Sequence, residues 1–79
     1  MGRRVLVIED DTAIRLGITD ALRFEGYEPC AAADGRRGRE MAIEIACDLV
    51  LLDLVLPGGD GLSILRDIRE VRPTLPVII

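Results

Sequence analysis

The chain has 79 residues, 49% of them hydrophobic and only 3% aromatic, which is enough for one small domain. Its formal net charge is −4, and an acidic chain is a poor candidate for binding nucleic acid. All ten basic residues are arginines, so chemistry that needs a lysine or a histidine is excluded within these residues.

Short apolar runs argue against insertion into a membrane. The longest unbroken aliphatic runs, 5–8 and 49–52, fall far short of the roughly 20 residues that cross a bilayer. The basic start of the chain is followed by an apolar stretch that ends at once in acidic residues, which is not the pattern of a signal peptide. We therefore expect a cytoplasmic protein in which Cys30 and Cys47 are free thiols.

Strand and helix patterns alternate along the chain. Apolar runs bounded by acids or turn residues predict strands, and helical spacing with capping residues predicts helices. The predicted order is a strand at 5–8, a helix at 12–24, a strand at 28–33, a helix at 36–47, a strand at 49–56 interrupted by Asp53, a loop at 57–61, a helix that ends before Pro73, and a strand from 77.

Each predicted helix has an apolar stripe and a start or stop signal. Asp11 or Thr12 is expected to cap the first helix, Gly26 to end it, and Asp60 to cap the third. The residues expected to face the core are Ile14, Ile18, Ala21 and Leu22 in the first helix, Met41, Ala42 and Ile45 in the second, and Leu62, Leu65, Ile68 and Val71 in the third.

The alternation of strands and helices predicts an α/β fold with a doubly wound parallel sheet, because parallel strands need helical crossovers. In such a sheet the carboxyl ends of the strands form the functional edge. Glu9, Asp10 and Asp11 follow the first strand, and Asp53 stands in the apolar third strand. These acids would repel one another, and Mg²⁺ would relieve that repulsion.

The simplest alternative is that acids after a strand only cap a helix, which we expect of Asp11. Asp53 is harder to explain in this way, because a carboxylate inside an apolar strand is costly unless it reaches the strand end or a partner. A carboxylate beside Mg²⁺ can accept a phosphoryl group, which makes Asp53 the candidate nucleophile and Glu9 and Asp10 the candidate metal ligands.

The chain resembles the receiver domain of bacterial response regulators. The resemblance rests on the segments 5–11, 14–15, 26–27, 34–35, 48–61 and 75–79. It implies a flavodoxin-like sheet of order 2-1-3-4, truncated before a fifth strand, so that residues 1–79 would be the N-terminal two-thirds of the domain. The order itself is the one described for this fold in general.

The resemblance also implies roles for particular residues. Asp53 matches the phosphoacceptor, Glu9 and Asp10 match the acidic pair that binds Mg²⁺ with it, and Val55 matches the position whose backbone carbonyl completes the metal site. Pro57 and Gly61 match the loop that follows. A Thr or Ser and a phosphate-binding Lys, expected later in the family pattern, lie outside these 79 residues.

The implied function is a phosphoacceptor module rather than an enzyme. It would take a phosphoryl group from a histidine kinase or phosphotransfer protein and regulate an output domain, with DNA-binding transcription control as the expected output. Without the later elements, we expect slow phosphorylation, weak Mg²⁺ binding and no productive switching. Arg15, Leu16 and the arginines at 36, 37 and 39 are candidate partner contacts.

Two other functions stay open. One is an Mg²⁺-dependent aspartyl-phosphate hydrolase, although such enzymes usually have a second Asp two residues after the nucleophile, where this chain has Val55. The other is an interaction module that works without phosphorylation.

Two expectations concern surfaces. The last strand would leave an exposed apolar edge, which favours a homodimer or a swapped dimer. The regular row of Arg66, Arg69 and Arg72 is expected to be a solvated helix face.

Overall fold

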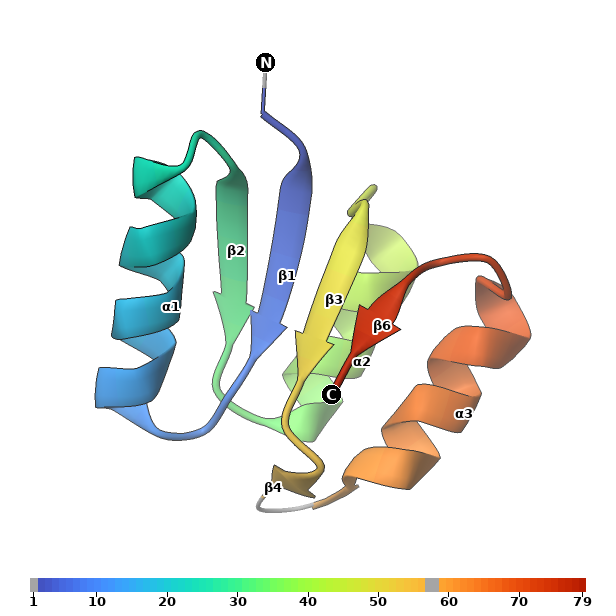
Figure 1. The fold of residues 1–79 in the computed structure, drawn as a ribbon. Helices are drawn as coiled ribbons and strands as arrows, with labels where there is room; N and C mark the ends of the chain where they lie inside the picture. Colours follow the sequence, from blue (N-terminus) through green and yellow to red (C-terminus); the bar gives the residue numbers. More distant parts are fainter. Residues whose placement is uncertain (1, 57–58) are drawn as a thin grey trace.

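The computed structural model describes residues 2–56 and 59–79, and for residues 59 and 60 it describes the backbone without the side chains. Strands and helices alternate along most of the chain (Figure 1). In order they are β1 (Arg4–Ile8), α1 (Thr12–Phe24), β2 (Glu28–Ala32), α2 (Gly35–Glu44), β3 (Leu49–Leu52), β4 (Val55–Leu56), β5 (Gly59–Asp60), α3 (Gly61–Val71) and β6 (Val77–Ile78).

The main sheet is parallel and has the strand order β2-β1-β3-β6. This confirms the predicted doubly wound α/β fold with the order 2-1-3-4, because β6 is the predicted fourth strand. In the register of the sheet, Ile8 lies between Ala32 and Leu52. The carboxyl ends of β1 and β3 therefore lie side by side (Figure 1).

The prediction that the third strand resumes after Asp53 is wrong. Val55–Leu56 forms β4, which pairs antiparallel with Gly59–Asp60 in a small separate sheet. The Asp53 carboxylate accepts a hydrogen bond of 3.0 Å from the Val55 N–H. This is an Asx-type turn, in which the side chain bonds the backbone two residues on and redirects the chain.

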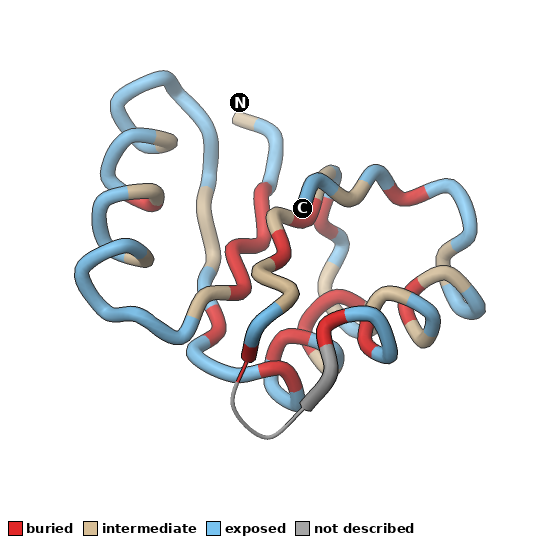
Figure 2. The backbone as a smooth tube through the Cα atoms, turned by 60° about the horizontal axis from the view of Figure 1, so that its bottom comes forward, coloured by how far each residue is buried: buried red, intermediate tan, exposed pale blue. Residues whose placement is uncertain are grey.

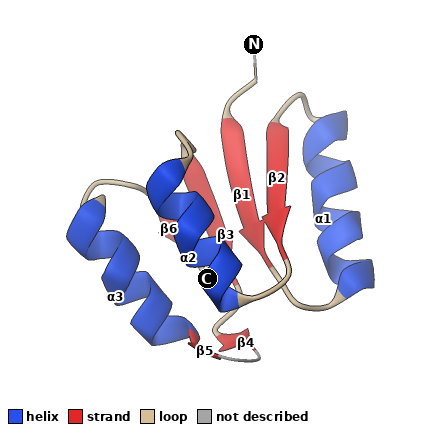
Figure 3. Cartoon of the chain, turned by 180° about the vertical axis from the view of Figure 1, so that it is seen from behind, coloured by secondary structure: helices blue, strands red, loops and turns tan. Residues whose placement is uncertain are grey.

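Helices cover both faces of the main sheet. α1 lies on one face, whereas α2 and α3 lie side by side on the other (Figures 1 and 3). The main buried cluster lies between α2, α3 and the sheet (Figure 2). It consists of Leu6, Ile8, Ala32, Met41, Ala42, Cys47, Val50, Leu52, Leu56, Ile64, Ile68 and Leu75. No residue of α1 belongs to this cluster.

Helix α1 has the predicted bounds but only part of the predicted buried face. Asp11 caps it by accepting a hydrogen bond of 2.9 Å from the Ile14 N–H, and Gly26 follows it with a φ of 91°. Ile14 is 52% exposed and Ala21 is also exposed, while the one fully buried residue is Thr19. Within residues 2–56 and 59–79, no other helix lies beside α1 on this face, so Ile14 and Ala21 stay exposed although they were predicted to face the core.

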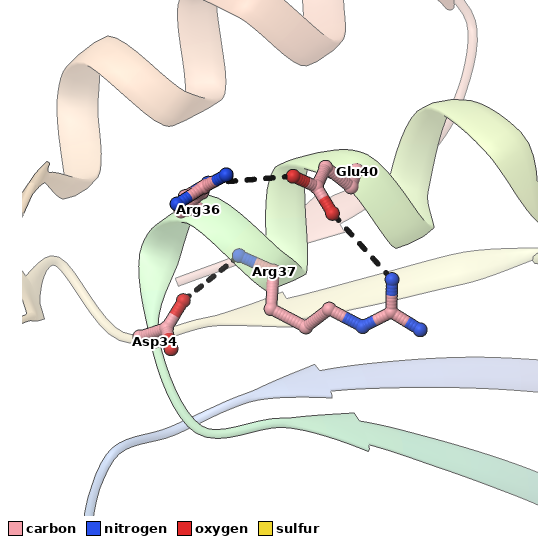
Figure 4. Close-up of polar contacts among 4 residues, drawn as sticks. All are labelled: Asp34, Arg36, Arg37 and Glu40. Atoms are coloured by element: carbon pink, nitrogen blue, oxygen red, sulfur yellow. Dashed lines mark hydrogen bonds and ion pairs between the residues drawn. The ribbon is translucent and has the colours of Figure 1, made fainter.

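Helix α2 is shifted from its predicted bounds of 36–47 and ends three residues early. It begins at Gly35 because Asp34 caps it, accepting a hydrogen bond from the Arg37 N–H (Figure 4). It ends at Glu44 because Ile45 is extended, with a ψ of 140°. The predicted inward residues Met41 and Ala42 are buried, and Ile45 is half-buried.

Arginines dominate the first turn of α2. Glu40 pairs with both Arg36 and Arg37 at 3.5 Å (Figure 4). The two guanidinium side chains are 89% and 58% exposed, so water screens these ion pairs and they add little stability. The negative charge of Glu40 thus offsets part of the positive charge of Arg36 and Arg37.

Helix α3 packs through a stripe that agrees in part with the predicted one. Ile68 is buried and Leu65 is half-buried against the core, as predicted, and Gly61 and Ile64 are buried as well. Leu62 and Val71, also predicted to face the core, are 47% and 55% exposed. The expected stripe began one residue too late because Gly61, which has no side chain, was not counted as a packing residue. The Asp60 side chain, predicted to cap this helix, lies outside the described residues, as do Pro57 and Gly58.

The arginine row of α3 is not a solvated face, contrary to expectation. Arg66 is exposed, but Arg69 and Arg72 are half-buried, and Arg69 donates to the Leu75 carbonyl. Arg72 donates from Nη1 to the carbonyls of Ala42 and Ile45, at 3.2 and 3.3 Å, and to the Cys47 sulfur at 3.4 Å. Its Nη2 donates to the Cys47 carbonyl at 3.1 Å.

Both cysteines are free thiols, Cys47 buried and Cys30 half-buried. Burial, followed by the neighbouring Cys47, raises the pKa of the Cys30 thiol. Among the described residues, no helix is long and apolar enough to span a bilayer.

Gly38 brings α2 close to the sheet. A Cβ at this position would lie 2.6 to 2.8 Å from three side-chain atoms of Ile8. The arginine-rich helix therefore packs tightly against β1, because the glycine removes the side chain that would separate them. Gly17, in the interior of α1, has nothing within 4 Å of the same hypothetical atom.

These two glycines predict opposite effects of one substitution. Gly17→Ala should raise the free energy of unfolding by about 1 kcal/mol, because alanine is the better helix former. Gly38→Ala should lower the free energy of unfolding by about 1–3 kcal/mol, because the added methyl group would overpack the core at Ile8. Denaturant unfolding of both variants measures the difference. Adding Ile8→Val to Gly38→Ala should restore part of the loss, and stabilisation by both alanines would contradict the close packing of α2.

Candidate functional site

Three acids meet at the carboxyl edge of the main sheet. Glu9 and Asp10 follow β1, and Asp53 follows β3, the neighbouring strand. One carboxylate oxygen from each lies within 4.8 Å of the others. The structure therefore brings together the three carboxylates that the sequence analysis selected, in an arrangement that could hold a metal ion.

The backbone N–H groups of two of these acids continue the hydrogen bonding between the strands just beyond the strand ends. The Glu9 N–H donates to the Ala32 carbonyl, and the Asp53 N–H donates to the Ile8 carbonyl, both at 3.1 Å. These bonds fix the acids relative to β1 and its two neighbours. Asp53 is fixed a second time, because the Val55 N–H bonds one of its carboxylate oxygens.

Asp11 does not belong to the group. Its carboxylate caps α1, as predicted, while its N–H donates to a carboxylate oxygen of Glu9 at 3.1 Å. The cap therefore orients a member of the acidic cluster, although it does not join that cluster itself.

The electrostatics of the cluster favour a positive ligand. Partial burial raises the pKa of the Glu9 carboxyl, and the nearby Asp53 and Asp10 carboxylates raise it further. The hydrogen bond from the Asp11 N–H acts in the opposite direction. A proton or a cation would relieve the repulsion between these groups, since both neutralise negative charge in the cluster.

Arg15 reaches the cluster from α1, and the sequence analysis missed this role. Its Nη1 donates to the carbonyl oxygens of Glu9 and Asp10, at 2.9 and 3.3 Å. The sequence predicts Arg15 as a contact for a partner protein, and the structure shows these backbone contacts in addition. The signal available in the sequence was a cation in the first turn of a helix, where the helix dipole disfavours positive charge.

Val55 and Gly61 follow Asp53 and lie near the site through backbone contacts. Val55 is 82% exposed and donates its N–H to Asp53, while the predicted metal contact of its carbonyl stays a prediction. Gly61 donates its N–H to the Leu54 carbonyl at 3.2 Å, and a Cβ there would lie 2.4 Å from the Leu54 Cα. The glycine thus permits the close return of the chain towards Asp53.

An apolar groove adjoins the acids. Its volume is about 390 Å³, and both Glu9 and Asp53 lie at its border. The apolar residues that line it come from α1, β1, β3 and the end of the chain: Val7, Ile8, Ile14, Ile18, Leu51, Leu52, Ile78 and Ile79. The last two are 55% and 64% exposed, which fits the expected apolar edge at the fourth strand.

Comparison with known proteins gives consistent matches. The family described as "Response regulator receiver domain" matches residues 5–79. The transcriptional activator protein PfeR of Pseudomonas aeruginosa is 41% identical over 76 residues, which cover 96% of this chain and 25% of PfeR. The chain spans 25–34% of the length of curated relatives such as PfeR and the MprA response regulators.

Solved structures match over almost the whole chain. The response regulator TrrA of Thermotoga maritima, in complex with Mg²⁺ and BeF, has a TM-score of 0.93, with 32% identity over 98% of this chain and 67% of that one. The complex of the histidine kinase ThkA with TrrA gives a TM-score of 0.88 at 32% identity, covering 95% of this chain and 65% of that one.

Proposed function

The chain belongs to the receiver domains of response regulators, and from this premise we propose that it accepts a phosphoryl group on Asp53 in the presence of Mg²⁺. The observation that carries the proposal is the meeting of three carboxylates at the edge formed by β1 and β3. Matching structures support it, since TrrA was solved with Mg²⁺ and BeF and also with a histidine kinase.

The residues present fit Mg²⁺. Oxygens bound to one octahedral Mg²⁺ lie about 3.0 Å apart when adjacent and about 4.2 Å apart when opposite, since each bond is about 2.1 Å long. The three carboxylate oxygens lie within 4.8 Å of one another, so small side-chain rotations would bring them to these separations. Glu9, Asp10 and Asp53 would hold the ion, and the Val55 carbonyl is proposed as a further ligand. Bound there, Mg²⁺ would neutralise charge on the incoming phosphoryl group.

Asp53 is proposed as the nucleophile. One of its carboxylate oxygens is held by the Val55 N–H, which leaves the other oxygen to attack the phosphorus. A P–O bond forms to Asp53 as the bond between phosphorus and the donor group breaks, and the departing group takes up a proton. Glu9 and Asp10 remain unmodified, and their backbone contacts keep them beside Asp53.

The wider role follows from the family. We propose a cytoplasmic signalling module that takes its phosphoryl group from a histidine kinase or phosphotransfer protein and controls transcription through an output domain. The proposal includes pairing of two copies along the apolar edge at β6. Hydrolysis of an external substrate is not favoured, because Val55 stands where aspartyl-phosphate hydrolases usually have a second Asp, two residues after the nucleophile.

The proposal is tested by incubating the chain with a small phosphoryl donor, with Mg²⁺ or with EDTA, and measuring the intact mass. We expect slow addition of one phosphoryl group with Mg²⁺ only, as an acyl phosphate that hydroxylamine removes. No addition at high donor and Mg²⁺ concentrations would overturn the proposal and favour an interaction module that works without phosphorylation.

The raised pKa of Glu9 predicts how pH and metal act on stability. A raised pKa means that the folded chain favours protonated Glu9, so this contribution to stability is present at low pH and is lost as the pH rises through the raised pKa. In EDTA at pH 7, Glu9→Gln should therefore raise Tm. In Mg²⁺ the order should reverse, because the amide is the poorer ligand.

Thermal unfolding at pH 5 and pH 7, with EDTA or Mg²⁺, measures these effects. Glu70→Gln, which changes an exposed glutamate of α3, is the matched control and should leave Tm unchanged in all four conditions. If Glu9→Gln lowered Tm in EDTA at pH 7, the described repulsion among the carboxylates would be incorrect.

A further inference from the structure

Arg15 contacts the acidic cluster in a way that its own helix does not explain. It lies in the first turn of α1, where a positive charge is unfavourable to the helix dipole. Its side chain is nevertheless folded back over the helix start, and Nη1 donates to two consecutive carbonyls, those of Glu9 and Asp10. The residue is half-buried, so these bonds are partly shielded from water.

Asp10 depends on this contact more than the other two acids do. Glu9 is fixed by the Ala32 carbonyl and Asp53 by the Ile8 carbonyl. Within residues 2–56 and 59–79, Asp10 makes one hydrogen bond, which its carbonyl accepts from Arg15. Its side chain is exposed, so no packing holds it in place.

We propose that Arg15 is a positioning residue for the cation site: its guanidinium fixes the Glu9–Asp10 backbone and thereby holds the Asp10 carboxylate ready for the ion. The inference rests on the proposed function. Two carbonyls fixed by one planar donor group define the peptide planes on either side of Asp10, and those planes set the direction of its side chain. Outer-shell contacts of this kind commonly affect metal affinity by about 10–100-fold.

A simple charge effect predicts the opposite result. A guanidinium beside the site repels a divalent cation, so removing its charge would tighten metal binding if Arg15 acted only through its charge. If Arg15 positions Asp10, its removal should weaken binding. The sign of the change therefore separates the two roles.

The test measures Mg²⁺ affinity by calorimetry, well below Tm, for the wild type and three variants. Arg15→Met should weaken binding by about 10-fold, and its phosphorylation rate should approach the wild-type rate when Mg²⁺ is saturating. Arg15→Lys should fall in between, since an ammonium keeps the charge but not the planar donor. Arg23→Met is the control on the same helix, since the Arg23 side chain pairs with Asp20 at the exposed surface, and it should bind as the wild type does.

A second readout does not require the metal. The Asp11 N–H bonds the Glu9 carboxylate, so its hydrogen exchange in EDTA reports the order of the loop. Arg15→Met should speed this exchange, and Arg23→Met should not. Unchanged exchange together with unchanged or tighter Mg²⁺ binding would overturn the inference. If the wild type bound no Mg²⁺ while Arg15→Met still sped the exchange, the proposed function would fail and the positioning role would stand.

Discussion

Replacing Asp53 by asparagine is expected to abolish phosphorylation of the chain. An amide oxygen is a far weaker nucleophile than a carboxylate, and the neutral side chain also removes one of the three charges that would hold Mg²⁺. The fold should persist, because the Asn side chain can still accept the hydrogen bond from the Val55 N–H. Mass spectrometry after incubation with a small phosphoryl donor and Mg²⁺ measures the effect.

Asp11→Asn is the matched control for this experiment. It is the same chemical change close to the site, but Asp11 lies outside the cluster and caps α1. Asparagine caps helices about as well as aspartate does, so stability and labelling should be retained. Equal labelling of the Asp53→Asn variant and the wild type would remove Asp53 as the acceptor and place the phosphoryl group on another residue.

The largest expected effect on stability comes from Arg72. Helix α2 has no basic residue in its last turn, and the carbonyls near its end are instead bonded by Arg72, the residue that follows α3. Arg72→Met keeps the aliphatic stem but leaves the carbonyls of Ala42, Ile45 and Cys47 without this donor. A hydrogen bond that involves a charged group contributes about 1.5–3 kcal/mol to stability. Because Arg72 is half-buried and its bonds share one guanidinium, we expect a loss of about 2–3 kcal/mol for the whole group rather than for each bond.

Such a loss is a large part of the stability of a chain this small, which is about 4–12 kcal/mol. Tm should fall by about 10–20 °C, as measured by thermal unfolding followed by circular dichroism. Arg66→Met, on the exposed side of α3, should change the free energy of unfolding by no more than about 0.5 kcal/mol. If both variants unfolded at the same temperature, the hydrogen bonds from Arg72 to the end of α2 would not stabilise the fold.

The sequence predicted those parts of the fold that depend on local signals. Both ends of α1 were correct, because Asp11 and Gly26 mark them within the segment itself. The prediction of the end of α2 was wrong, because the helix ends where Ile45 becomes extended and where Arg72, 30 residues after Ala42, bonds the Ala42 carbonyl. The prediction that the third strand resumes after Asp53 was wrong as well. The hydrogen bond from the Val55 N–H to the Asp53 carboxylate turns the chain there, although the apolar pattern continues.

The candidate site shows the same division. The acids could be identified because parallel strands bring their carboxyl ends to one edge, and the topology followed from the alternation of elements. The contacts of Arg15 and Arg72 could not, because a long side chain on a helix can point into solvent or fold back, and periodicity does not distinguish these directions. The roles of Asp53, Glu9, Asp10 and Val55 in phosphorylation stay predictions.

The unequal cover of the two sheet faces has a consequence for motion. The main buried cluster lies on the α2 and α3 face, whereas the one buried residue of α1 is Thr19. Segments with few buried contacts open locally at a lower free energy than the whole domain unfolds. Detachment of α1 would thus precede global unfolding, and it would carry Arg15 away from the Glu9–Asp10 loop. The least stable layer of the molecule is therefore the one that borders its acidic site, so local opening of α1 and order at that site are coupled.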